Sequence, residues 1–97
     1  TQKIMYLEII SPEAKLFSGK VTSVTVPGID GEFQMLNHHA AIISILAKGD
    51  IKIAADSFEF SKEAEGKFFL GDDKKYHLSI NSGTLEMNDN KINILVD

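Results

Sequence analysis

Val24-Thr25-Val26-Pro27-Gly28-Ile29-Asp30-Gly31-Glu32-Phe33-Gln34-Met35 is the stretch that decides the fold of this 97-residue chain. Apolar and polar residues alternate on both sides of a short turn, the pattern of two β-strands that each bury one face. Gly28 and Gly31 bracket the turn, and Asp30 and Glu32 place two carboxylates at its tip. The stretch therefore predicts a β-hairpin with an exposed acidic end.

The same period-2 alternation recurs along the whole chain. Its apolar members are Met5/Leu7/Ile9, Val24/Val26, Phe33/Met35, Ile43/Ile45, Ile51/Ile53, Phe58/Phe60, Leu78/Ile80, Leu85/Met87 and Ile92/Ile94/Val96. We expect each set to face inward, because polar residues mostly stand between its members. A single open sheet of nine or ten strands would leave an apolar face uncovered. The sequence predicts one all-β domain over residues 1–97, a flattened ten-stranded β-sandwich or barrel of antiparallel strands.

Two segments carry more local predictions. Leu85–Ile94 reads as a hairpin, because Asn88-Asp89-Asn90 supplies residues that tolerate left-handed backbone angles. Ser61–Gly66 could be a charged hairpin tip or one short helical turn. We predict the tip, since six residues do not sustain a helix on their own.

Composition excludes several classes of function. The chain has no cysteine, so disulfides, thiolate metal sites and cysteine nucleophiles are unavailable. All ten basic residues are lysines and the net charge is −4, which argues against nucleic-acid binding. The longest apolar run, Ala40–Ile43, is far shorter than the roughly 20 residues of a membrane-spanning helix, and no secretion signal is evident. We expect no direct membrane insertion.

Residues that could carry chemistry do not form a convincing catalytic set. His38 and His39 are adjacent, so in an extended chain they point to opposite faces, and His77 is the only other imidazole. Asp30 and Glu32 could be the paired carboxylates of a glycosidase, but at an exposed turn both should stay ionised. No nucleophile elbow or phosphate-binding loop is present. We predict no catalytic, cofactor or metal site and no small-molecule substrate.

Several segments together resemble a known family. They are Phe17-Ser18-Gly19, Val24–Phe33, His39-Ala40, Leu46–Ile53, Asn81–Met87 and Ile92–Asp97. In this order they are similar to the epsilon subunit of F-type ATP synthase, whose mitochondrial counterpart is called delta. The Pro-Gly-x-Asp-Gly-Glu-Phe stretch followed by His-Ala is the most specific part of the resemblance.

The resemblance implies a ten-stranded β-sandwich and a non-catalytic role in the central stalk of the rotor. Such a subunit couples the gamma subunit to the membrane c-ring during ion-driven ATP synthesis, at the cytoplasmic face of the bacterial inner membrane. Family members usually continue into a two-helix domain that in some binds ATP and inhibits hydrolysis. This chain stops at Asp97, so we expect it to lack that domain.

Carried over residue by residue, the resemblance assigns partner-binding roles. Glu32 matches an exposed acid that faces the c-ring loops, and His39 matches a histidine near the same contact. Asp30, Phe33 and His38 are their neighbours and complete the predicted partner-binding set. We also expect an apolar patch on one face of the sandwich where gamma docks, although the sequence does not locate it.

Two other functions stay open at this point. One is a secreted or surface β-sandwich module that binds carbohydrate or protein ligands, which the absence of tryptophan and the presence of only two tyrosines disfavour. The other is a small metal-dependent hydrolase built on His38, His39 and His77, which would need bound metal in the purified protein.

Overall fold

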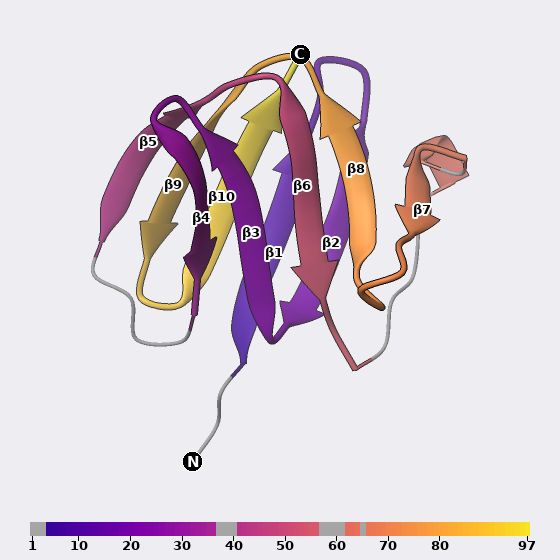
Figure 1. Cartoon of the computed structure of the whole chain (residues 1–97), viewed down its shortest axis with the longest axis horizontal. Coiled ribbons are helices and arrows are strands. Elements are labelled where there is room, and N and C mark those ends of the chain that lie inside the picture. Colours follow the sequence, from indigo (N-terminus) through magenta and orange to yellow (C-terminus); the bar gives the residue numbers. More distant parts are fainter. Residues whose placement is uncertain (1–3, 37–40, 57–61, 65) are drawn as a thin grey trace.

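The computed structural model describes residues 4–36, 41–56, 62–64 and 66–97, and these form a β-protein (Figure 1). The elements are β1 (Met5–Ile10), β2 (Lys15–Val21), β3 (Ser23–Gly28), β4 (Gly31–Met35), β5 (Ile42–Leu46), β6 (Gly49–Ala54), a 3₁₀ turn η1 (Lys62–Ala64), β7 (Phe68–Leu70), β8 (Tyr76–Ile80), β9 (Gly83–Asn88) and β10 (Lys91–Val96). The predicted strand residues Phe58 and Phe60 lie outside the described residues.

The ten strands belong to one sheet that folds over on itself. Its order is β2-β1-β10-β9-β5-β3-β6-β8-β7, and β4 pairs with β3 beside this path. β5 meets β3 at one residue pair only, Gly28 with Leu46, and the sheet bends there. On one side of the bend β3, β4, β6, β7 and β8 form a layer, and β1, β2, β5, β9 and β10 form the other (Figure 1). The predicted all-β class and flattened ten-stranded architecture are confirmed.

One strand pair departs from the predicted antiparallel arrangement. β1 and β10 run parallel, with Leu7 beside Ile92 and Ile9 beside Ile94. A hairpin forces neighbouring strands to be antiparallel, but these two strands come from opposite ends of the chain and no turn joins them. All four side chains are fully buried, so the parallel register aligns the apolar faces of both strands. The sheet is therefore mixed.

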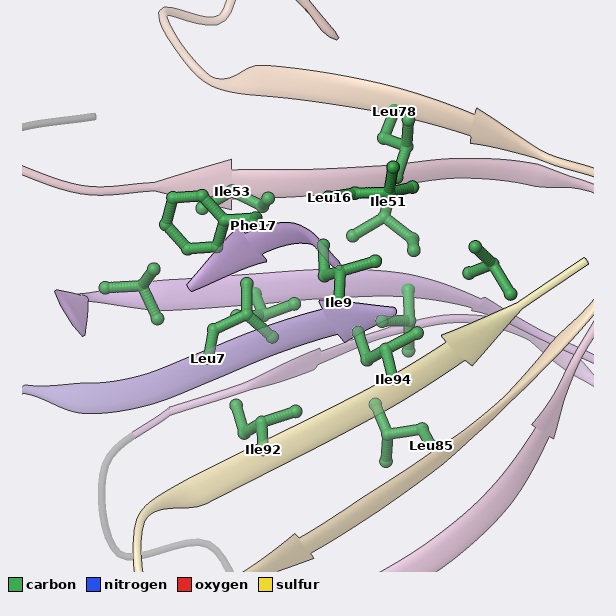
Figure 2. Packing of buried hydrophobic residues seen from close by; sticks show 14 of the residues in the cluster. Leu7, Ile9, Leu16, Phe17, Ile51, Ile53, Leu78, Leu85, Ile92 and Ile94 are labelled. Atoms are coloured by element: carbon green, nitrogen blue, oxygen red, sulfur yellow. The ribbon is translucent and has the colours of Figure 1, made fainter. Parts of the chain in front are cut away.

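The core lies between the two layers. Its buried residues come from every strand, and Figure 2 shows Ile9 and Ile94 pointing toward Ile51 and Leu78 of the facing layer. The fully buried large side chains are Met5, Leu7, Ile9, Met35, Leu46, Ile51, Ile53, Leu85, Met87, Ile92, Ile94 and Val21. These are mostly the alternating residues of the predicted strands, which is why the pattern predicted the fold.

The prediction for Ser61–Gly66 was wrong. Lys62–Ala64 form one 3₁₀ turn, and the N–H of Lys67 donates to the carbonyl of Ala64 at 2.9 Å. Ala64 is fully buried, and the turn lies against β2. Close by, the rings of Phe17 in β2 and Phe68 in β7 pack edge to face, 6.4 Å between centroids. Burial against the other edge of the sheet stabilises a turn that local propensity would not support.

The prediction that Ile43 and Ile45 face the core was also wrong. These side chains are 78% and 60% exposed. Residues directly opposite each other in a sheet share a face, and β9 places Leu85 opposite Ser44 rather than opposite an isoleucine. Because Leu85 is buried, the register turns Ser44 inward and both isoleucines outward.

The second hairpin follows its prediction. β9 and β10 are joined by Asp89 and Asn90, which have φ angles of 51° and 63°. Two consecutive left-handed residues are the mark of a type I′ turn, which matches the twist of the flanking strands.

Candidate functional site

The acidic hairpin tip forms as predicted. Gly28 pairs with Gly31, so Ile29 and Asp30 alone make the loop between β3 and β4. Asp30, Gly31 and Glu32 are all exposed. Gly31 has a φ of +130°, a backbone angle that disfavours other residues. Both carboxylates therefore face solvent at one corner of the molecule.

Phe33 holds the tip in place from inside. Its ring is partly buried and packs against the core. A Cβ added at Gly28 would lie 2.7 Å from Cε1 of Phe33 and 2.8 Å from the carbonyl oxygen of Gly31, so only glycine fits there. Of the predicted partner-binding residues, Phe33 thus has an evident structural role, and its role in binding stays a prediction.

Glu32 is paired within the molecule, which the sequence did not suggest. Its Oε2 lies 2.9 Å from Nζ of Lys52 in β6. The pKa of Lys52 is raised above its usual value of 10.5, chiefly by this hydrogen bond to Glu32, with smaller contributions from the charges of Asp73 and Asp50. The side chain of Glu32 remains half exposed, so part of the carboxylate is open to a partner.

The predicted site residues His38 and His39 lie outside the described residues. Their proximity to Glu32, which the resemblance implies, stays a prediction.

His77 sits in a charged cluster that sequence reasoning missed. Nε2 of His77 lies 3.0 Å and 3.1 Å from the two carboxylate oxygens of Asp73, and Nδ1 lies 3.5 Å from Oδ2 of Asp50. The Phe69 ring stacks on the imidazole at 5.0 Å between centroids. The hydrogen bond to His77 is the main reason that the pKa of Asp73 is lowered from 3.8, and the backbone N–H of Lys75 adds to the effect.

This cluster explains a buried imidazole on the outer side of the sheet. His77 in β8 pairs with Lys52 of β6 on one side and with Phe69 of β7 on the other. Lys52 lies on the outer face of the sheet, so His77 does too. The turn between β7 and β8 folds over the ring and brings Asp73 onto it. The only signal in the sequence was Gly71-Asp72-Asp73 close before His77, which also fits an ordinary turn. Among the described residues no three histidine or acidic side chains converge as metal ligands would.

An exposed apolar patch adjoins the acidic tip. We define the outer apolar patch as Ile29, Ile43, Ile45 and Leu95, which are 63%, 78%, 60% and 54% exposed. Thr84 of β9 pairs with Ile45 on one side and with Leu95 on the other, so the patch crosses three adjacent strands.

The acidic tip and the outer apolar patch share one shallow hollow. Ile29, Asp30 and Phe33 line it from the hairpin, and Ile43 and Ile45 line it from β5. Contiguous exposed aliphatic side chains beside charged ones are typical of protein docking surfaces.

The described residues include no helix long and apolar enough to cross a bilayer. The fold and the site together define a β-sandwich domain with an acidic hairpin tip beside an exposed apolar patch.

Comparison with known proteins identifies the family. Residues 4–63, more than half of the chain, match the family described as ATP synthase, Delta/Epsilon chain, beta-sandwich domain. The chain belongs to this family. This assignment confirms the resemblance found in the sequence and supports neither the carbohydrate-binding module nor the metal-dependent hydrolase.

Individual relatives agree. The ATP synthase epsilon chain of Chlorobium limicola is 40% identical over 70 residues, which cover 71% of this chain and 80% of that protein. That of Nitratiruptor sp. is 37% identical over 91 residues, covering 94% of this chain and 59% of the relative. The Helicobacter pylori protein is 29% identical and is covered over 63% of its length. The chain thus spans about three fifths of the length of several relatives that it matches.

Solved structures show the same fold. A chain of the Tetrahymena thermophila mitochondrial ATP synthase, from a structure of its central stalk and c-ring, superposes with a TM-score of 0.68 at 19% identity, covering 95% of this chain and 62% of that one. A chain of the Euglena gracilis mitochondrial enzyme gives 0.69 at 18% identity, with 93% and 48% covered.

Proposed function

We propose that this protein is a central-stalk subunit of an F-type ATP synthase that couples the gamma subunit to the c-ring during ion-driven rotation. The observation that supports this role best is that the acidic tip and the outer apolar patch, two chemically unlike surfaces, line one hollow. A polar acidic tip and an aliphatic patch suit two different partners, which a coupling subunit must hold together.

The acidic tip is the proposed contact with the c-ring. Asp30 lies in the two-residue loop and Glu32 is the second residue of β4, and neither belongs to the core. Carboxylates there suit polar or basic loop ends, and the contact adds orientation more than affinity because exposed ion pairs contribute only about 0.2–1 kcal/mol each. His38, His39 and Phe33 remain the proposed neighbours in this contact.

The outer apolar patch is the proposed contact with gamma. Aliphatic side chains that stay exposed in the free domain stabilise a complex when a partner buries them. Three of its four residues lie on β5 and β10 and Ile29 lies in the hairpin loop, so a partner there would rest mainly on the sheet. The sequence alone did not predict which exposed side chains form this patch.

The proposed role needs no turnover by this chain and places it peripherally at the cytoplasmic face of the bacterial inner membrane. It acts through its partners and has no substrate, cofactor or nucleic acid to bind.

Co-purification tests the proposal. The tagged protein is mixed at micromolar concentration with gamma and with purified c-ring from the same organism, and we expect a stoichiometric complex. Glu32→Lys should weaken attachment to the ring and coupled ion pumping while the domain stays folded by circular dichroism. Recovery of neither partner would refute the proposed function, and unchanged coupling in Glu32→Lys would remove the acidic tip from the ring contact.

A further inference from the structure

Lys52 and Glu32 are on different strands and meet over a third. β3 lies between β4 and β6, and its residues Thr25 and Pro27 pair with Lys52 and Glu32 respectively. The two charged side chains reach diagonally across the outer face of β3, and their charged atoms are 2.9 Å apart. Lys52 is the less exposed partner, at 28% against 51% for the side chain of Glu32.

The other two acidic side chains near Lys52 already accept hydrogen bonds from other groups. Asp50 in β6 accepts a hydrogen bond from the Ser79 hydroxyl at 2.8 Å and faces His77. Asp73 accepts from the backbone N–H of Lys75 at 3.0 Å and contacts His77. Both carboxylates, with Glu32, favour the charged form of Lys52. The ammonium is thus held among three acids and makes its ion pair with the one at the hairpin tip.

We propose that Lys52 is a positioning residue that fixes the direction in which the Glu32 carboxylate is presented to the c-ring. The inference rests on the proposed function of the acidic tip. A glutamate on a free hairpin end must give up rotamer freedom when a partner binds, and this lowers affinity. The ion pair with Lys52 orders the side chain beforehand, while its exposed half stays open to the partner.

The test measures binding of the protein, in complex with gamma, to purified c-ring. Lys52→Met keeps the aliphatic stem and removes the charge, and we expect binding about two- to fivefold weaker, the range of an exposed ion pair. Lys52→Arg should restore binding to within about twofold, because guanidinium also pairs with carboxylate. Glu32→Gln combined with Lys52→Met should bind no more weakly than Glu32→Gln alone, since one interaction is lost in both.

Lys15→Met is the matched control. It breaks a similar cross-strand pair, Lys15 with Glu8 at 3.1 Å, away from the hairpin tip. We expect it to leave ring binding unchanged, and unfolding midpoints of all variants check that the fold is intact.

The outcomes separate the two proposals. If Glu32→Gln weakens binding but Lys52→Met binds as well as the natural protein or better, the positioning role is wrong and the proposed function stands. If Lys52→Arg fails to restore binding, or the double variant is clearly weaker than Glu32→Gln, Lys52 acts in some other way. If Glu32→Gln has no effect, the ring contact itself is wrong, and the positioning role falls with it.

Discussion

Replacing Ile43 and Ile45 together by threonine should weaken binding to gamma without unfolding the domain. Both side chains lie on β5 and point away from the core. Threonine keeps the β-branched shape that suits a strand and removes most of the aliphatic surface.

The size of the effect follows from the exposed fractions. Complete burial of an isoleucine contributes about 1.5–3 kcal/mol. Ile43 and Ile45 keep 78% and 60% of their surface exposed in the free domain. A partner that covers them could therefore gain about 2–4 kcal/mol from the pair. Threonine should forfeit at least half of this, which corresponds to about five- to thirtyfold weaker binding.

Titration calorimetry or surface plasmon resonance with purified gamma measures the loss. Leu70→Thr is the matched control, because Leu70 is 61% exposed but lies on β7 at the far end of the sheet order. Gamma binding that is unchanged in the double variant, or weakened equally by Leu70→Thr, would refute the assignment of the outer apolar patch to gamma.

Three further changes test the fold and its electrostatics. Ile94→Ala, at a fully buried position in β10, should lower the free energy of unfolding by about 2–5 kcal/mol in a denaturant titration, and a loss below about 1 kcal/mol would contradict the packing described. Gly28→Ala should cost about 1–3 kcal/mol in the same assay, because its methyl group would collide with Phe33; a neutral result would show that the tip is looser than we describe. Asp73→Asn should be less stable than the natural protein at pH 7. Because the folded-state pKa of Asp73 is lowered, its contribution is present above pH 3.8 and is lost as the pH falls through the lowered value, so the two proteins should converge in acid. A difference that persists there would contradict the hydrogen bonds assigned to the Asp73 carboxylate.

Local sequence signals predicted the hairpins well. Gly31, and likewise Asp89 and Asn90, encode their turns through backbone angles that few residues adopt, and Gly28 leaves room for the neighbouring Phe33 ring, so these signals lie within the hairpins themselves. The exposed Asp30 and Glu32 followed directly from the first of these turns.

Features that depend on distant contacts were not predictable in this way. Whether Ile43 and Ile45 face in or out depends on the register with β9, and a shift of one residue would reverse it. The 3₁₀ turn at Ala64 exists because another edge of the sheet covers it. His77 is buried because a turn folds over it, and no periodicity within β8 records that. In each case contacts between segments far apart in the chain select one local conformation, and the local sequence pattern fits either conformation.

The absence of native cysteine permits the most direct test of the central claim, that the tip meets the c-ring and the patch meets gamma. Single cysteines are introduced as Asp30→Cys and Ile45→Cys, each labelled with a short photoactivatable crosslinker and assembled into the ATP synthase. We predict that the Asp30→Cys protein crosslinks to the c subunit and the Ile45→Cys protein to gamma. Crosslinks to the opposite partners, or to neither, would contradict the account.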